Sequence, residues 1–96
     1  MAIKDYAKKV AGKKKDDIFL FTLSTCVWCK KTKKLLKELG LEYSYIDLDM
    51  MEHEIEDEVV KEFDHWNPKQ SFPTIVVNNK MCIVGYEEDK IKELGK

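Results

Sequence analysis

Residues 23–39 read LSTCVWCKKTKKLLKEL, in which two cysteines, two residues apart, are followed by five lysines and three leucines. Cys26 and Cys29 could be half of a metal site, a structural disulfide, or a pair of thiols that exchanges electrons with other molecules. The segments on either side of the pair indicate which chemistry the two thiols can perform.

The cysteine pair lies between a predicted strand and a predicted helix. Residues 18–21 are apolar on both faces, which is typical of a central strand packed between two layers. Residues 27–39 have the spacing of an amphipathic helix that ends at Gly40, with its lysines outward. Its inward positions are Thr32, Leu35, Leu36 and Leu39, and Cys29 is in register with them.

The rest of the chain continues this alternation. Residues 43–48 predict a second strand, parallel to the first because a helix connects them, and residues 52–65 predict a second long helix. Residues 74–77 and 81–84 predict an antiparallel hairpin turning at Asn78-Asn79-Lys80, and a last helix follows Gly85. Residues 3–11 show apolar positions at helical spacing, so we expect a short helix capped by Gly12.

Length and composition predict one soluble domain. The 96 residues leave no room for a second core, so we expect a single domain over 1–96, with a core at 18–94 and a helical N-terminal extension at 1–15. No segment resembles a membrane span or a secretory signal, which predicts a cytoplasmic protein that does not bind membranes. A structural disulfide is disfavoured in that reducing compartment. We also expect a monomer.

The charge distribution gives little support to nucleic-acid binding. The net charge is −1, with eleven lysines and four acids in residues 1–40 (net +7) and six lysines and fourteen acids in residues 41–96 (net −8). The lysines come without arginine or interleaved aromatic residues, so we interpret the two regions as solvated faces that tune solubility and encounter rates.

Four segments together resemble the glutaredoxin-type members of the thioredoxin-fold superfamily. They are FTLSTCVWC (21–29), YIDLD (45–49), FPT (72–74) and GY (85–86), and the likeness spans residues 18–94. The resemblance implies an α/β fold with a four-stranded mixed sheet flanked by helices, to which this chain would add its N-terminal helix. It also implies a dithiol-disulfide oxidoreductase that reduces protein disulfides and is itself reduced by a partner.

The surroundings of the two thiols favour the redox interpretation independently. Cys26 would lie at the start of the helix, where unpaired backbone N–H groups, the helix dipole and the nearby Lys30 and Lys31 favour a thiolate. Cys29 would be buried on the inward face and less readily ionised. We therefore expect Cys26 to attack a substrate disulfide and Cys29 to release the product by closing the Cys26–Cys29 bond.

The resemblance also implies a set of substrate-binding residues. In the family, the proline equivalent to Pro73 is cis and faces the cysteine pair, and the residue before it, here Phe72, offers backbone groups to an extended substrate. The position of Trp28 beside the thiol favours an exposed docking rim over a core position. The matching motif positions Thr25, Val27, Gly85 and Tyr86 complete the expected set.

A metal site is the alternative from another class of protein. Cys26, Cys29 and Cys82 with His53 or His65 could supply zinc ligands, and some glutaredoxins share an iron–sulfur cluster between subunits. Zinc sites usually contain a second close pair of ligands, which this chain lacks. We therefore expect no metal, and we interpret Cys82 as a packing residue inside a strand.

Departures from the family pattern bear on the electron source. Glutathione-dependent glutaredoxins usually have a lysine where this chain has Leu23, Thr-Val where it has Ser71-Phe72, and Gly-Gly followed closely by Asp where it has Val84-Gly85, with Asp89 displaced. Cys-Val-x-Cys and Gly-Tyr-x-x-Asp-Lys instead resemble redoxins of the NrdH type, which a reductase protein reduces. We expect such a protein as the electron source and no cofactor, with glutathione-dependent activity as the alternative.

Overall fold

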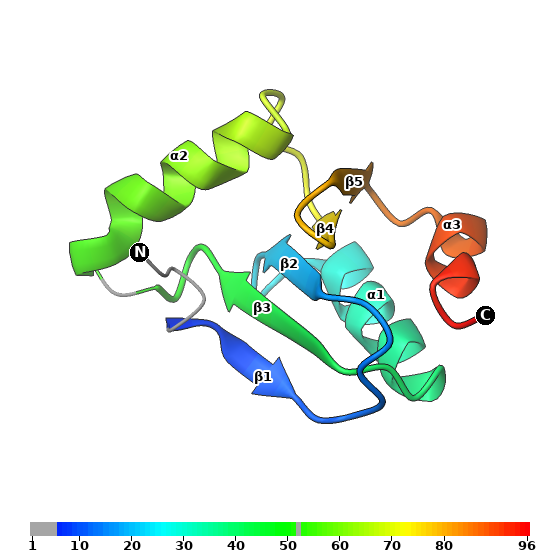
Figure 1. Ribbon diagram of the computed structural model, residues 1–96. Coiled ribbons are helices and arrows are strands. Elements are labelled where there is room, and N and C mark those ends of the chain that lie inside the picture. Colours follow the sequence, from blue (N-terminus) through cyan, green and yellow to red (C-terminus); the bar gives the residue numbers. More distant parts are fainter. Residues whose placement is uncertain (1–5, 52) are drawn as a thin grey trace.

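The computed structural model describes residues 6–51 and 53–96, and its centre is a five-stranded mixed sheet with the strand order β1-β3-β2-β4-β5 (Figure 1). The central strand β2 (Ile18–Thr22) is buried along its whole length. It pairs in parallel with β3 (Tyr43–Asp47) and antiparallel with β4 (Thr74–Val77), and β4 pairs antiparallel with β5 (Met81–Val84). The predicted four strands and their directions are therefore confirmed.

Helices cover both faces of this sheet. On one face, α1 (Val27–Glu38) and α3 (Glu88–Glu93) bury apolar side chains against Ile18 and Leu20 of β2. On the other, the short 3-10 helix η2 (His53–Ile55) and α2 (Glu56–Trp66) pack over Phe19 and Phe21. Successive side chains of a strand point to opposite faces, so β2 contributes to both cores, as its two-sided apolar pattern predicts.

The predicted N-terminal helix is wrong over residues 8–10. Lys8–Val10 forms the strand β1, which pairs antiparallel with β3 in the register Lys8↔Tyr45 to Val10↔Tyr43, and residues 3–5 lie outside the described residues. The sheet consequently has five strands. A helix of nine residues has little stability of its own, whereas the exposed edge of β3 offers unpaired backbone groups to an extended segment.

Gly12 has a role different from the predicted helix cap. A Cβ atom at this position would lie 2.7 Å from the carbonyl carbon of Leu41 and 2.8 Å from the amide nitrogen of Glu42. The neighbouring Lys13 donates its N–H to the Gly40 carbonyl and accepts from the Glu42 N–H. Glycine at residue 12 therefore allows the N-terminal segment to approach the backbone that leads into β3.

The remaining element boundaries differ little from prediction. The second long helix was expected at 52–65, but residue 52 lies outside the described residues, the turn over 53–55 is 3-10, and α2 continues to Trp66. Asn78 and Asn79 both have a φ of 53°, which confirms the expected hairpin turn between β4 and β5. Within the described chain, no helix is long and apolar enough to cross a membrane.

Candidate active site

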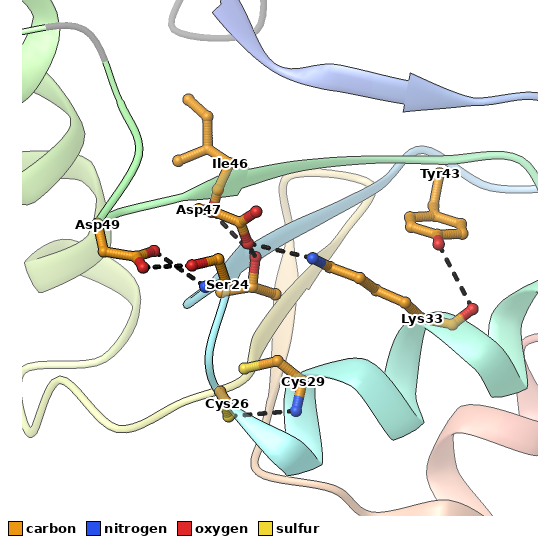
Figure 2. A network of polar contacts seen from close by, with 9 residues as sticks. Ser24, Cys26, Cys29, Lys33, Tyr43, Ile46, Asp47 and Asp49 are labelled. Carbon is orange, nitrogen blue, oxygen red and sulfur yellow. Dashed lines mark hydrogen bonds and ion pairs between the residues drawn. The ribbon is translucent and has the colours of Figure 1, made fainter.

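The cysteine pair lies where β2 passes into α1, as predicted. Cys26 is the N-cap residue of α1, with extended backbone angles, and its sulfur accepts a 3.2 Å hydrogen bond from the Cys29 N–H (Figure 2). Its own N–H donates to the Leu23 carbonyl, and its carbonyl accepts from the Lys30 N–H. The Cys26 sulfur thus replaces the side-chain oxygen that usually accepts from the first turn of a helix.

Cys29 differs strongly from Cys26 in its environment. Its exposed fraction is 0%, whereas Cys26 is partly exposed. Burial raises the pKa of the Cys29 thiol from 9.0 to about 12, and the hydrogen bond with Cys26 acts in the same direction. The Leu23 backbone and the Lys33 ammonium partly oppose this rise. The structure therefore places a shielded, neutral thiol one helical turn from a more accessible one.

The turn that precedes Cys26 is fixed by a carboxylate that sequence reasoning treated only as part of a strand motif. Asp49 accepts a 2.9 Å hydrogen bond from the Ser24 N–H and a second from the Ser24 hydroxyl (Figure 2). These two bonds hold the pKa of Asp49 below its usual value. Asp49 thereby ties the cysteine turn to the segment that follows β3.

A cis peptide bond joins Phe72 to Pro73, which confirms the conformation that the family resemblance implied. Thr74 is the register partner of Phe21, so Pro73 lies at the same edge of the sheet as the chain leading to Cys26. The Pro73 carbonyl accepts a 2.8 Å hydrogen bond from the Gly85 N–H. The Phe72 ring stacks on Phe63 in the core, at a centroid distance of 4.9 Å.

Exposed aromatic and apolar side chains surround the start of α1. Trp28 is 52% exposed, which agrees with a position on the rim, and its ring stacks on Tyr86 at a centroid distance of 5.6 Å. The Lys31 ammonium lies 4.6 Å from the Trp28 ring centroid. Val27 is 62% exposed, and Thr25 is exposed as well. The stack of Trp28 on Tyr86 thereby joins residues that are far apart in the sequence, close to the cysteine turn. Gly85, with a φ of 82°, redirects the chain toward Tyr86.

Asn67 organises the loop that carries the cis-proline, a role that the sequence did not reveal. This buried side chain donates through Nδ2 to the Ser71 carbonyl (3.1 Å), the Ser71 hydroxyl (3.0 Å) and the Thr74 hydroxyl (3.0 Å). The Thr74 hydroxyl donates in turn to the Ser71 carbonyl. In the sequence, Asn67-Pro68 is typical of a helix end and gives no sign of this role, because asparagine and proline both favour turns.

The residues of the alternative metal site are not gathered around the cysteine pair. Cys82 donates to the carbonyl of Trp66, His65 packs edge-on against the Trp66 ring, and His53 lies beside Glu56. Over residues 6–51 and 53–96, no group of three or more His, Cys, Asp or Glu side chains could hold a metal ion. Cys82 is partly buried against the core beneath α2.

This architecture is a thioredoxin fold: a mixed sheet lies between helices, and the cis-proline lies at the same sheet edge as the cysteine turn. The Cys-x-x-Cys turn at the start of α1 makes it a thioredoxin-fold protein with a dithiol site. The glutaredoxin family model matches residues 18–82, so the chain belongs to the glutaredoxin family, whose members are in general thiol-disulfide oxidoreductases.

Solved structures agree with this assignment. The glutaredoxin from Methanosarcina mazei Go1 is similar with a TM-score of 0.85 and 44% identity, over 96% of this chain and 90% of that one. Methanoredoxin from Methanosarcina acetivorans is similar with a TM-score of 0.85 and 42% identity, over 91% of this chain and 93% of that one. The glutaredoxin from Archaeoglobus fulgidus is similar with a TM-score of 0.73 and 32% identity, over 83% of this chain and 86% of that one. Among curated protein sequences there is no significant match.

Proposed function

We propose that this protein reduces protein disulfides by a two-cysteine mechanism, with Cys26 as the nucleophile and Cys29 as the resolving thiol. The observation that carries the proposal is the contrast between the two thiols. Cys26 is partly exposed at the N-terminus of α1, and Cys29 is fully buried with its pKa raised to about 12. An accessible sulfur can meet a substrate, while a shielded thiol remains protonated until the substrate is attached.

The reaction has two exchanges. The Cys26 thiolate attacks one sulfur of the substrate disulfide, a bond forms between them, and the other substrate sulfur leaves as a thiolate that takes up a proton. Cys29 then loses its proton and attacks the Cys26 sulfur, and the second substrate thiol is released. The substrate gains two electrons and two protons, and the protein is left with a Cys26–Cys29 disulfide.

The exposed rim is suited to a protein substrate. Val27 and the stacked pair of Trp28 and Tyr86 offer apolar surface beside Cys26, and such surface favours contact with the side chains that flank a disulfide. The Phe72 ring packs on Phe63 in the core, which leaves the backbone before the cis peptide bond as the part of Phe72 proposed to meet a substrate. In this proposal Thr25, Gly85 and the backbone of Phe72 and Pro73 contact an extended segment of the substrate.

Substitution of the cysteines tests the division of labour. Cys29→Ser retains the nucleophile and should accumulate a mixed disulfide with a protein substrate, whereas Cys26→Ser should lose disulfide reduction. Intact-protein mass spectrometry after incubation with a disulfide-containing protein, followed by treatment with dithiothreitol, detects the adduct and its release. Cys82→Ser serves as the control and should behave like the unaltered chain. Capture of substrate by Cys26→Ser instead would reverse the assignment.

For the electron source, we propose a reductase protein in preference to glutathione. Glutathione carries two carboxylates and an amine, and each charged hydrogen bond lost at a partly buried site costs about 1 to 3 kcal/mol. Leu23 supplies no cation, and Asp89 lies in the first turn of α3. Val84 is 41% exposed and places a side chain where two successive glycines would allow close approach of the tripeptide.

Two coupled assays with the same protein disulfide separate these electron sources. Turnover with thioredoxin reductase and its nicotinamide cofactor should exceed turnover with glutathione and glutathione reductase by roughly a hundredfold if two such losses add. Leu23→Lys should raise the glutathione-coupled rate, whereas Lys69→Ala, a change of an exposed lysine in the loop after α2, should leave both rates unchanged. Equal rates in the two assays for the unaltered protein would favour the glutathione-dependent alternative.

A further inference from the structure

A partly buried ion pair lies beside the cysteine turn. The Lys33 ammonium is 3.1 Å from Oδ1 of Asp47 and 3.8 Å from the ring centroid of Tyr45. The Thr22 hydroxyl donates to the same Asp47 oxygen. Figure 2 shows the Lys33 side chain extending from α1 across to the end of β3, where it meets Asp47. These contacts hold the positive charge of Lys33 in one place.

Lys33 differs from the other lysines of α1. The side chains of Lys33 and Asp47 are only 19% and 12% exposed, whereas the remaining lysines of this helix are exposed: Lys30, Lys31, Lys34 and Lys37. Removing an ion pair from water is costly, and replacing such a pair by apolar residues is often neutral or stabilising. The stability of the fold alone therefore gives no strong reason for a half-buried ammonium at this position.

The position of Lys33 relates it to Cys29. The two residues are four apart on α1, which places them on one face of the helix, a single turn from each other. Cys29 is buried on that face, and Figure 2 shows both side chains projecting from α1 toward the sheet. We propose that the Lys33 ammonium, held in place by Asp47 and Thr22, stabilises the Cys29 thiolate during the resolving exchange.

This inference rests on the proposed function, in which Cys29 must lose a proton before it attacks the Cys26 sulfur. The positive charge of Lys33 lowers the pKa of the Cys29 thiol against the larger effect of burial. In the mixed disulfide Cys26 carries neither a thiol nor a thiolate. Its side-chain hydrogen bond and its charge therefore no longer raise the pKa of Cys29. Burial then remains, opposed by the Leu23 backbone and by Lys33.

The other elements around Cys29 contribute few charges. The flanking strands β2 and β4 have the sequences IFLFT and TIVV, without a titratable side chain, and the buried residue of the adjacent α3 is Ile91. From β3, Asp47 and Tyr45 contact the Lys33 ammonium, and the buried Tyr43 hydroxyl donates to the Lys33 carbonyl at 3.4 Å. Asp49, which follows β3, is bonded to Ser24. Lys33 is therefore the cation that the geometry places to favour a thiolate at Cys29, and Asp47 and Thr22 are its positioning residues.

The two exchanges can be followed separately with the chromogenic disulfide DTNB in a Cys82→Ala background. Attack by Cys26 releases one coloured thiolate, and attack by Cys29 on the resulting mixed disulfide releases the second. Stopped-flow absorbance gives a rate constant for each phase, measured from acid to alkaline pH. Lys33→Met should slow the second phase about three- to tenfold at neutral pH and move its rise to higher pH, since each unit of thiol pKa changes the thiolate fraction tenfold.

Matched variants complete the test. Lys34→Met removes the same charge from an exposed position of α1 and should leave the second phase unchanged, and Lys33→Arg should retain most of its rate. A poorly folded Lys33→Met protein would lose amplitude in both phases, and Lys33→Gln would then be measured in its place.

Three results would overturn the inference: an unchanged second phase in Lys33→Met, equal slowing by Lys34→Met, or slowing without a change in the pH profile. If the Cys82→Ala protein with Lys33 intact shows no second phase at all, the resolving role of Cys29 fails first.

Discussion

Cys26 and Cys29 carry the same functional group, three positions apart, but the fold gives them different surroundings. Cys26 caps α1 and is partly exposed, while Cys29 lies on the buried face of the same helix. The helical period alone predicts this difference. Cys29 lies three residues after the cap, on the same inward face of the helix as Thr32 and Leu36. The strength of the difference depends on the tertiary packing, which leaves Cys29 with an exposed fraction of 0%.

The raised pKa of Cys29 predicts how the stability of the reduced protein depends on pH. Folding favours the protonated thiol, so this contribution is intact below the ordinary value of 9.0 and is lost as the pH rises through about 12. Urea denaturation of the reduced protein should therefore show stability declining over that window more steeply than in Cys29→Ala. Tyr43, whose pKa burial also raises to about 12, contributes equally to both proteins and cancels. Parallel curves would contradict the burial of Cys29 as a neutral thiol.

Among the elements, the loop between α2 and β4 shows how one buried side chain can hold a functional backbone. Asn67 reaches across this loop to Ser71 and Thr74, on both sides of the cis peptide bond. The structure shows that residues 67–71 form a turn closed by Asn67. Local sequence cannot reveal this, since the same Asn-Pro pair also marks any helix end.

Asn67→Ala should weaken both the fold and the reaction with protein disulfides. The substitution leaves the Ser71 carbonyl and the Thr74 hydroxyl without their amide partner, at a cost of about 1 to 3 kcal/mol in the free energy of unfolding. Denaturation measures that cost, and the rate with a protein disulfide compared with the rate with DTNB shows whether substrate positioning suffers more than thiol reactivity. Lys69→Ala, on the same loop but exposed, is the control. Equal losses with both substrates would argue against a positioning role.

The strand β1 is the element for which sequence reasoning failed. Its residues show the apolar spacing of a short helix, and three residues are too few to display the alternation of a strand. The pairing partner of β1, the free edge of β3, lies more than thirty residues later in the chain. Tertiary pairing therefore overrode a weak local preference, as happens for short segments.

On the scale of the whole molecule, the sheet separates the third cysteine from the redox pair. Cys82 packs partly against the core beneath α2, whereas α1, which carries Cys29, covers the opposite face with α3. The Cys82 thiol donates to the Trp66 carbonyl at 3.4 Å. The topology thus favours a disulfide between Cys26 and Cys29 that leaves Cys82 as a thiol.

Mild oxidation should accordingly consume two thiols and leave one. Peptide mapping of the oxidised protein is expected to find the Cys26–Cys29 link and an alkylated Cys82, with a reduction potential of about −200 to −280 mV, the range between glutaredoxins and thioredoxin. Cys82→Ala should oxidise at the same potential. A link from Cys82 to either of the other cysteines would contradict this assignment of the redox pair.

The sequence by itself determined the strand-turn-helix that holds Cys26 and Cys29, the four principal strands, and, through family resemblance, the cis bond at Pro73. These features depend on short-range periodicity and on motifs contained within a few residues. Only the tertiary structure decided that residues 8–10 form an edge strand, that Asn67 holds the cis-proline loop, and that Lys33 meets Asp47 beside Cys29. Each of these depends on which backbone groups and charges the packed chain brings together and shields from water, and local patterns carry no information about partners that lie far along the chain.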